Sequence, residues 1–176
     1  MENNFQKIDS KKLKFNAFEL LDDDWMLVTA GVKDRFNTMT ASWGGFGILW
    51  NKAVAFVFIR PTRFTFQFSE KYDDMTLSFF TEQYREALKF CGANSGKDVD
   101  KVEKCGFTLF ETESGAISFN EARLILECKK LSFQDINPEN FLDMKLNNIY
   151  PKKDYHRMYI CEITGCYVKN SSTGVL

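Results

Sequence analysis

The order of apolar and polar positions along the chain predicts a protein built mainly from short β-strands. Residues 53–59 form a continuously apolar run, as expected of a strand covered on both faces. Residues 37–43 alternate instead, with hydroxyl side chains on one face and apolar side chains on the other, which is typical of a half-buried strand. Two more strands are expected at residues 25–32 and 75–80.

Helical spacing appears in the middle of the chain. An apolar stripe with the spacing of one helix face runs from Tyr84 to Cys91 and ends at Gly92. A second short helix is expected over residues 98–104, closing at Gly106.

Strands resume in the last third of the chain. Leu124, Leu126 and Cys128 share one parity, whereas Leu131 and Phe133 share the other. This change of phase at residues 129–130 predicts a β-bulge or bend, and a final strand is expected over residues 156–168. Many short strands with a few interrupting helices favour a closed antiparallel barrel over a parallel sheet.

Residues 63–69 fit two kinds of element. Their apolar residues alternate as in a strand. However, Phe64 and Phe68 also have the i, i+4 spacing of a helix, and Pro61 suits a helix's first turn. The alternation favours a strand.

Composition and charge limit the classes of function. At 176 residues and 44% hydrophobic content, the chain suits a single domain, residues 1–176, with its own core. Its formal net charge of −1 argues against a nucleic-acid partner. No apolar run approaches the roughly 18–20 residues of a membrane span, and the polar N-terminus does not resemble a secretory signal peptide. We therefore expect a cytoplasmic protein with no membrane partner.

The cysteine and histidine content argues against a metal site. The 5 cysteines are odd in number, none forms a Cys-x-x-Cys pair, and there is 1 histidine, so neither zinc nor a thioredoxin-type motif is expected. We expect reduced thiols that fill the core as small apolar groups. They are Cys91, Cys105, Cys128, Cys161 and Cys166.

The common catalytic motifs are missing from the sequence. There is no Gly-x-Gly-x-x-Gly, no Gly-Lys-Ser/Thr phosphate loop and no Gly-x-Ser-x-Gly elbow, and the glycines of residues 43–47 have the wrong spacing for a dinucleotide fold. Any catalysis is therefore expected to depend on a bound cofactor.

Three polar stretches are suited to an anionic, flat cofactor. Residues 38–42 offer a row of hydroxyl groups on one strand face. Residues 60–63 carry two arginines beside a possible helix start, and phosphate binds well to guanidinium groups combined with free backbone amides. Residues 94–101 form a polar turn that leads to a lysine. The plainer interpretations are an exposed strand face, solvated surface arginines and an N-capped loop.

His156 is the remaining candidate for chemistry. A lone histidine at the start of a strand is either structural or catalytic. Its neighbours Tyr155 and Arg157 suit the rim of a site.

Several stretches, taken in order, resemble the flavin reductase-like proteins of the FMN-binding split β-barrel class, which include the flavoredoxins. The similarity extends from about residue 25 to residue 168. The matching stretches are residues 37–45, 55–65, 77–80, 91–92 with 95–101, and 150–157.

This resemblance implies a mainly β fold: a six-stranded antiparallel split β-barrel of the Greek-key type with short flanking helices. It also implies a homodimer with one FMN per subunit near the interface, and a helix after Pro61, contrary to the alternation. The cofactor-binding residues that it implies are Asn37, Thr38, Met39, Thr40, Ala41, Ser42, Trp43, Arg60, Arg63, Thr65, Ser78, Cys91, Ser95, Gly96 and Lys101.

The function implied by the resemblance is hydride transfer from NADH or NADPH to flavin. His156 matches the position at which many flavin reductases carry Gly-Asp-His beside the nicotinamide site, and is the implied catalytic residue. This chain has Asp154-Tyr155-His156 there instead. The alternatives are a flavoredoxin-type electron-transfer protein without nicotinamide activity and a non-enzymatic dimer that binds flavin or another ligand.

Overall fold

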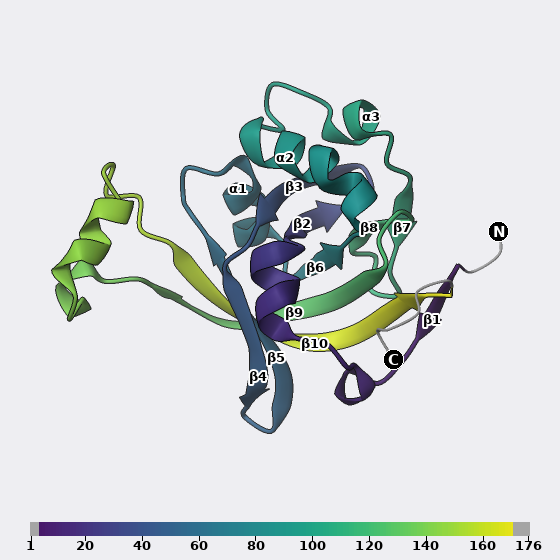
Figure 1. Cartoon of the computed structure of the whole chain (residues 1–176), viewed down its shortest axis with the longest axis horizontal. Helices are drawn as coiled ribbons and strands as arrows, with labels where there is room; N and C mark the ends of the chain where they lie inside the picture. The colour runs from purple at the N-terminus through teal and green to yellow at the C-terminus, as the bar shows by residue number, and fades with distance from the viewer. Residues whose placement is uncertain (1–3, 171–176) are drawn as a thin grey trace.

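One antiparallel sheet dominates the computed structural model, which describes residues 4–170 (Figure 1). Its strands are β1 (Phe5–Lys7), β2 (Met26–Val32), β3 (Arg35–Ala41), β4 (Gly44–Leu49), β5 (Lys52–Ile59), β6 (Asp74–Phe79), β9 (Leu124–Asp135) and β10 (Arg157–Lys169). The hydrogen-bonded order is β3-β2-β6-β9-β10-β5-β4, and β1 pairs with β10. The strands β7 (Leu109–Glu111) and β8 (Ile117–Phe119) form a separate two-stranded sheet.

Short helices complete the fold. The α-helices are α1 (Phe64–Lys71), α2 (Arg85–Ala93) and α3 (Lys101–Cys105). A π-helical turn, η2 (Glu19–Asp23), precedes β2, and 3-10 turns occur at η1 (Ser10–Lys12), η3 (Glu82–Tyr84), η4 (Pro138–Asn140) and η5 (Met144–Ile149). The expected mainly β architecture with added helices is confirmed.

Two details of the expected barrel differ from the structure. The sheet has eight strands rather than six, and its hydrogen-bonded path is open between the end strands β3 and β4. Although only Ser42 and Trp43 separate β3 from β4, the latter pairs with β5, and this hairpin extends away from the body (Figure 1). The free edge of β3 lies against helix α2 instead, where the Thr40 hydroxyl donates to the Leu88 carbonyl at 2.5 Å.

The strand predicted at residues 63–69 is wrong, because α1 occupies this segment. A turn closed by the Arg63 N–H, which donates to the Arg60 carbonyl at 3.0 Å, ends β5 and starts the helix. The helix buries Thr65 and Ser69 completely. Because these two buried residues are polar, the inner face of the helix cannot be recognised from the spacing of hydrophobic residues. The alternating phenylalanines are thus compatible with a helix whose buried face is partly polar.

The predicted helix after residue 98 begins later, at Lys101. The Asp100 carboxylate accepts the N–H groups of Val102 and Glu103 at 2.9 and 3.0 Å, which caps the first turn. Gly106 ends α3 with φ +66°, a left-handed conformation that glycine adopts without strain.

The predicted bulge in β9 is confirmed. Ile160 of β10 lies opposite Ser132 and Cys161 lies opposite Lys130, so Leu131 has no partner in this pairing. Because one extra residue is inserted there, the alternation of inward and outward side chains changes phase beyond the bulge. β9 therefore runs as one long strand through the phase change.

A long segment between β9 and β10 projects from the body. Figure 1 shows residues 136–156 (yellow-green) at the end of the extended β9–β10 pair, away from the rest of the sheet. Four of its apolar side chains are exposed: Leu142, Met144, Leu146 and Ile149. We call residues 136–156 the projecting segment.

The structure also bears on the expected burial of the cysteines and on the expected lack of a membrane span. All 5 cysteines are free; Cys105 is half-buried and the other four are buried. The expectation that the cysteines fill the core is confirmed for those four. Within residues 4–170, no helix is long and apolar enough to cross a membrane.

Candidate functional site

The three polar stretches singled out in the sequence meet in space. The Lys101 ammonium of α3 donates to the carbonyls of Thr38 in β3 and Cys91 in α2, at 2.7 and 2.8 Å. The Arg63 guanidinium donates to the Gly92 carbonyl at 3.0 Å. The stretches therefore form one continuous region, with the end of α2 between the two cations.

Asn37 connects this region to the start of α1 and to the polar turn. Its amide donates to the Thr65 hydroxyl at 2.7 Å. A Cβ placed at Gly96 would overlap the side-chain oxygen of Asn37. A larger residue there would have to displace the Asn37 side chain, so glycine at position 96 allows the turn to pack directly on β3.

A cavity of about 500 Å³ lies at the end of β3, and we call it the β3 pocket. Its volume is typical of small-molecule sites, which span about 300–1,000 Å³. Among its walls are the predicted residues Met39, Thr40, Ala41, Ser42, Trp43, Arg60, Arg63 and His156. The structure adds three residues that the sequence analysis did not select: Phe58, Thr62 and Asp154.

A neighbouring cavity of about 630 Å³ is lined by four other predicted residues: Asn37, Thr38, Gly96 and Lys101. Neither cavity is lined by Thr65, Ser78, Cys91 or Ser95. Of these, Ser78 is fully buried and hydrogen-bonds the Ser118 hydroxyl at 2.7 Å, whereas Ser95 is exposed. The predicted set is thus divided among two adjacent cavities, the protein interior and, for Ser95, the surface.

Protein groups already engage most of the hydroxyl row on β3. Thr38 accepts from the Thr29 hydroxyl at 2.9 Å, and Thr40 donates to the carbonyl of Leu88. The exposed-face interpretation is therefore wrong for these two threonines. Within residues 4–170, the Ser42 hydroxyl has no hydrogen-bond partner, so it is the member of the row that is available to a ligand.

The charge of Arg60 is balanced within the protein. Its guanidinium reaches both carboxylate oxygens of Asp154 at 3.2 Å and lies 4.9 Å from the ring centre of Tyr150. The Thr62 hydroxyl donates to the same carboxylate at 3.1 Å. These contacts hold the pKa of the Asp154 carboxyl below its usual range despite the opposing effect of burial.

Arg63 and Lys101, in contrast, have no carboxylate partner within residues 4–170. Burial lowers the pKa of both groups, and the charge of Arg60 lowers that of Arg63 further. Arg63 itself lowers the pKa of Lys101. Arg63 is half-buried and Lys101 is buried, and within the described residues both bond only to carbonyls. Two such cations that repel each other favour the approach of an anion.

His156 is a buried, neutral side chain at neutral pH. It is 8% exposed, its Nδ1 lies 2.9 Å from the Tyr150 hydroxyl, and its ring centre is 5.0 Å from that of Trp43. Burial, assisted by the charge of Arg60, lowers its pKa to about 4. His156 therefore enters any reaction at neutral pH without a charge.

Of the residues that the sequence analysis missed, Phe58 left some signal and Asp154 left little. Phe58 lies in the apolar run 53–59, where Ala55, Val57 and Ile59 are fully buried and Phe58 is not, so its larger ring occupies the more open face. The role of Asp154 left little signal, because its partner Arg60 is 94 residues away in sequence.

Comparison with protein families decides the identity of the domain. A family model described as a flavin reductase like domain matches residues 23–176. The chain belongs to this family. The resemblance noted in the sequence is thereby confirmed, and the fold is that of the flavin reductase-like, FMN-binding proteins.

Solved structures agree with this fold. An FMN-binding domain of a flavin reductase-like enzyme from Shewanella baltica has a TM-score of 0.70 at 21% identity, covering 99% of this chain and 82% of its own. The flavoredoxin of Methanosarcina acetivorans has a TM-score of 0.65 at 21% identity, covering 84% of this chain and 69% of its own.

A third similar structure is an NADH:FAD oxidoreductase from Streptomyces globisporus, with a TM-score of 0.64 at 15% identity, covering 84% of this chain and 76% of its own. A search of curated proteins found no significant match. The family membership supports a flavin-related oxidoreductase.

Proposed function

We propose that this protein binds FMN in the β3 pocket and acts as an oxidoreductase that takes hydride from NADH or NADPH. The observation that carries the proposal is the pair Arg63 and Lys101, two cations without a carboxylate partner beside an aromatic-walled pocket. A phosphate in a partly dry site requires cationic or N–H partners, and a flat ring requires apolar walls. The residues present fit both halves of FMN.

Specific residues serve each half of the cofactor. Arg63, Lys101 and the uncapped start of α1 would hold the phosphate, and the Ser42 hydroxyl and the indole of Trp43 would contact the ring system. When bound, FMN supplies the hydride-accepting centre. Trp43 and Phe58 exclude water from the apolar side of the pocket.

His156 acts in this proposal as a positioning group. Its contact with Tyr150 and its ring packing on Trp43 fix the imidazole at the pocket wall. Because burial keeps it neutral at pH 7, it orients the nicotinamide by hydrogen bonding or packing and does not deliver a proton. A substitution at His156 is therefore expected to slow reduction without a large change in FMN affinity.

Anaerobic mixing of the FMN-loaded protein with NADH and with NADPH tests the activity. We expect bleaching of the flavin absorbance by at least one of the two nucleotides, and slower bleaching in His156→Ala with FMN affinity retained. Lys89→Ala, which removes an exposed cation on α2, is the matched control and should behave like the unchanged protein.

The same experiment separates a second candidate function. Two observations favour an electron-transfer flavoprotein: the similarity to the flavoredoxin of Methanosarcina acetivorans, and the presence of Asp154-Tyr155-His156 in place of a Gly-Asp-His motif. A flavin that is reduced by dithionite but by neither nucleotide would contradict the reductase proposal and support this alternative. A protein that binds no FMN would contradict both and support a non-enzymatic role.

We also propose that the protein forms a homodimer through the projecting segment. Leu142 is 102% exposed and Met144 is 66% exposed, on a part of the chain that lies away from the body (Figure 1). Contiguous exposed apolar side chains of this kind mark protein interaction sites. A second copy is the partner that would bury them.

A further inference from the structure

A second cavity, of about 440 Å³, adjoins the β3 pocket. The two cavities share Ser42, Trp43 and Phe58 as walls. The walls that belong to the second cavity alone include Phe18, Leu21 and Ile136. We call it the Phe18 pocket.

The electrostatic character of the Phe18 pocket is opposite to that of the β3 pocket. The β3 pocket is lined by two arginines, Arg60 and Arg63, and by one carboxylate, Asp154, which pairs with Arg60. In the Phe18 pocket, Asp22 is the only lining residue with a charged side chain. An anionic ligand is therefore favoured in the first cavity and disfavoured in the second.

Two aromatic rings at the Phe18 pocket are exposed to solvent. Phe18 is 85% exposed and Trp43 is 46% exposed. Large apolar side chains gathered at a concave surface gain free energy when a ligand covers them. A flat apolar ring pairs best with such walls, because aromatic rings attract in offset or edge-to-face arrangements.

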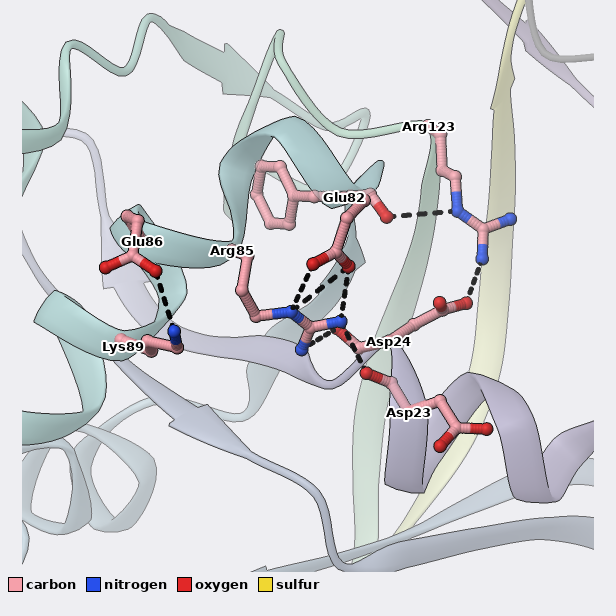
Figure 2. A network of polar contacts seen from close by, with 8 residues as sticks. Asp23, Asp24, Glu82, Arg85, Glu86, Lys89 and Arg123 are labelled. Atoms are coloured by element: carbon pink, nitrogen blue, oxygen red, sulfur yellow. Dashed lines mark hydrogen bonds and ion pairs between the residues drawn. The ribbon is translucent and has the colours of Figure 1, made fainter.

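Phe18, Leu21 and Asp22 lie in or next to η2, and hydrogen bonds from two arginines hold this turn in place. Figure 2 shows Arg85 at the end of η2, where it donates to the Asp23 and Asp24 carbonyls at 2.5 and 3.3 Å. Arg123 pairs with the Asp24 carboxylate and donates to the Phe80 carbonyl at 3.2 Å. These contacts fasten η2 to the segments around α2 and β9.

Leu21 also fixes η2, because its side chain packs in the hydrophobic core. It is 8% exposed and belongs to the main core, whereas its neighbours Phe18 and Asp22 reach the surface. The pocket thus has one wall residue that is fixed in the core, Leu21, and one exposed aromatic residue at its edge, Phe18. Preformed walls of this kind lower the entropic cost of binding.

We propose that the Phe18 pocket is a binding site for a small aromatic molecule that is neutral or cationic. Its aromatic and aliphatic walls select a flat ring, and Asp22 selects against negative charge. The occupant would lie next to the β3 pocket, because the two cavities have wall residues in common. The proposal does not depend on bound flavin, so its tests need none.

Three probes of similar size and different charge test it: benzylamine, benzyl alcohol and benzoate. Each is titrated into the protein while ligand-induced NMR shifts are followed. We expect benzylamine and benzyl alcohol to bind, and benzoate to bind at least about tenfold more weakly. Phe18→Ala should weaken benzyl alcohol about tenfold, and Ile48→Ala, which removes another exposed apolar side chain, should not.

Asp22→Asn provides the charge test. It should remove any preference for benzylamine over benzyl alcohol while leaving benzyl alcohol affinity unchanged. Equal affinities for all three probes, or probe binding that Phe18→Ala leaves intact, would overturn the proposal. FMN titrations of the same variants report on the β3 pocket separately, so a failure here is distinguishable from a failure of the proposed function.

Discussion

Arg60 and Arg63 are three positions apart and carry the same charge, yet their surroundings give them different roles. Arg60 meets a carboxylate, Asp154, and stacks on Tyr150, so it is part of the pocket wall. Arg63 bonds only to a carbonyl. The sequence predicted both as phosphate partners, because nothing local distinguishes them. The distinction arises when β10 pairs with β5 and brings Asp154 from far along the chain.

The single histidine predicts a pH effect on stability. The pKa of His156 is lowered to about 4 in the folded protein, whereas an exposed histidine titrates near about 6.5. Between these values the unfolded chain binds a proton that the folded chain does not, so stability is lost as the pH falls from about 6.5 towards 4. The expected loss is about 3 kcal/mol, since each unit of pKa shift corresponds to about 1.4 kcal/mol.

Urea unfolding at several pH values measures this loss. His156→Gln should show a shallower decline between pH 6.5 and 4, since the chain has 1 histidine and the variant has none. Only the slope is compared, because the substitution also alters the contact with Tyr150. Identical slopes in the two proteins would contradict the assignment of a buried neutral imidazole.

At the scale of elements, periodicity predicted strands and helices well where one face is apolar and the other polar. It located β2, β3, β5, β6, α2 and the bulge of β9. It misassigned α1, whose buried face includes Thr65 and Ser69. Hydrogen bonds from Asn37 and to Tyr159 satisfy these hydroxyls, and such tertiary partners are invisible to a local pattern.

The packing of the polar turn on β3 predicts that Gly96 is required. In Gly96→Ala the new methyl group would overlap Asn37 and disturb its hydrogen bond to Thr65. We expect a stability loss of about 1–3 kcal/mol and weaker FMN binding, because the turn supports Lys101. Thermal unfolding and FMN titration measure the two effects.

Gly45→Ala is the matched control for this substitution. A Cβ at Gly45 comes no closer than 3.6 Å to the Phe56 ring, an ordinary contact, so its effect should be small. Equal stability of Gly96→Ala and Gly45→Ala would show that the turn is not fixed by its contact with Asn37.

At the scale of the whole molecule, the sequence predicted a single mainly β domain but not the course of its sheet. Strand count and closure depend on which distant strands pair, and each pairing is set by contacts that no local pattern records. β4, for example, directly follows β3 in sequence and lies at the opposite end of the sheet. The family resemblance predicted α1 and the overall fold, whereas the projecting segment had no local signal.

The exposed apolar side chains of the projecting segment predict the effect of charge on assembly. Leu142→Asp combined with Met144→Asp should convert a dimer into a monomer, because burying the two carboxylates at an interface is unfavourable. Val32→Asp changes an exposed apolar residue elsewhere and should leave the dimer intact. Sedimentation velocity distinguishes the states. A monomeric unchanged protein would contradict the proposed dimer.

The proposed cofactor site is tested most directly by comparing the affinities of FMN and riboflavin, which differ by the phosphate alone. Calorimetric titrations of the unchanged protein and of Arg63→Ala provide the four values needed. We expect the unchanged protein to prefer FMN by at least tenfold, and Arg63→Ala to lose about 1.5–3 kcal/mol of FMN affinity with little effect on riboflavin. Equal affinities for the two flavins, or a preference for FMN that survives Arg63→Ala, would contradict a phosphate site at Arg63.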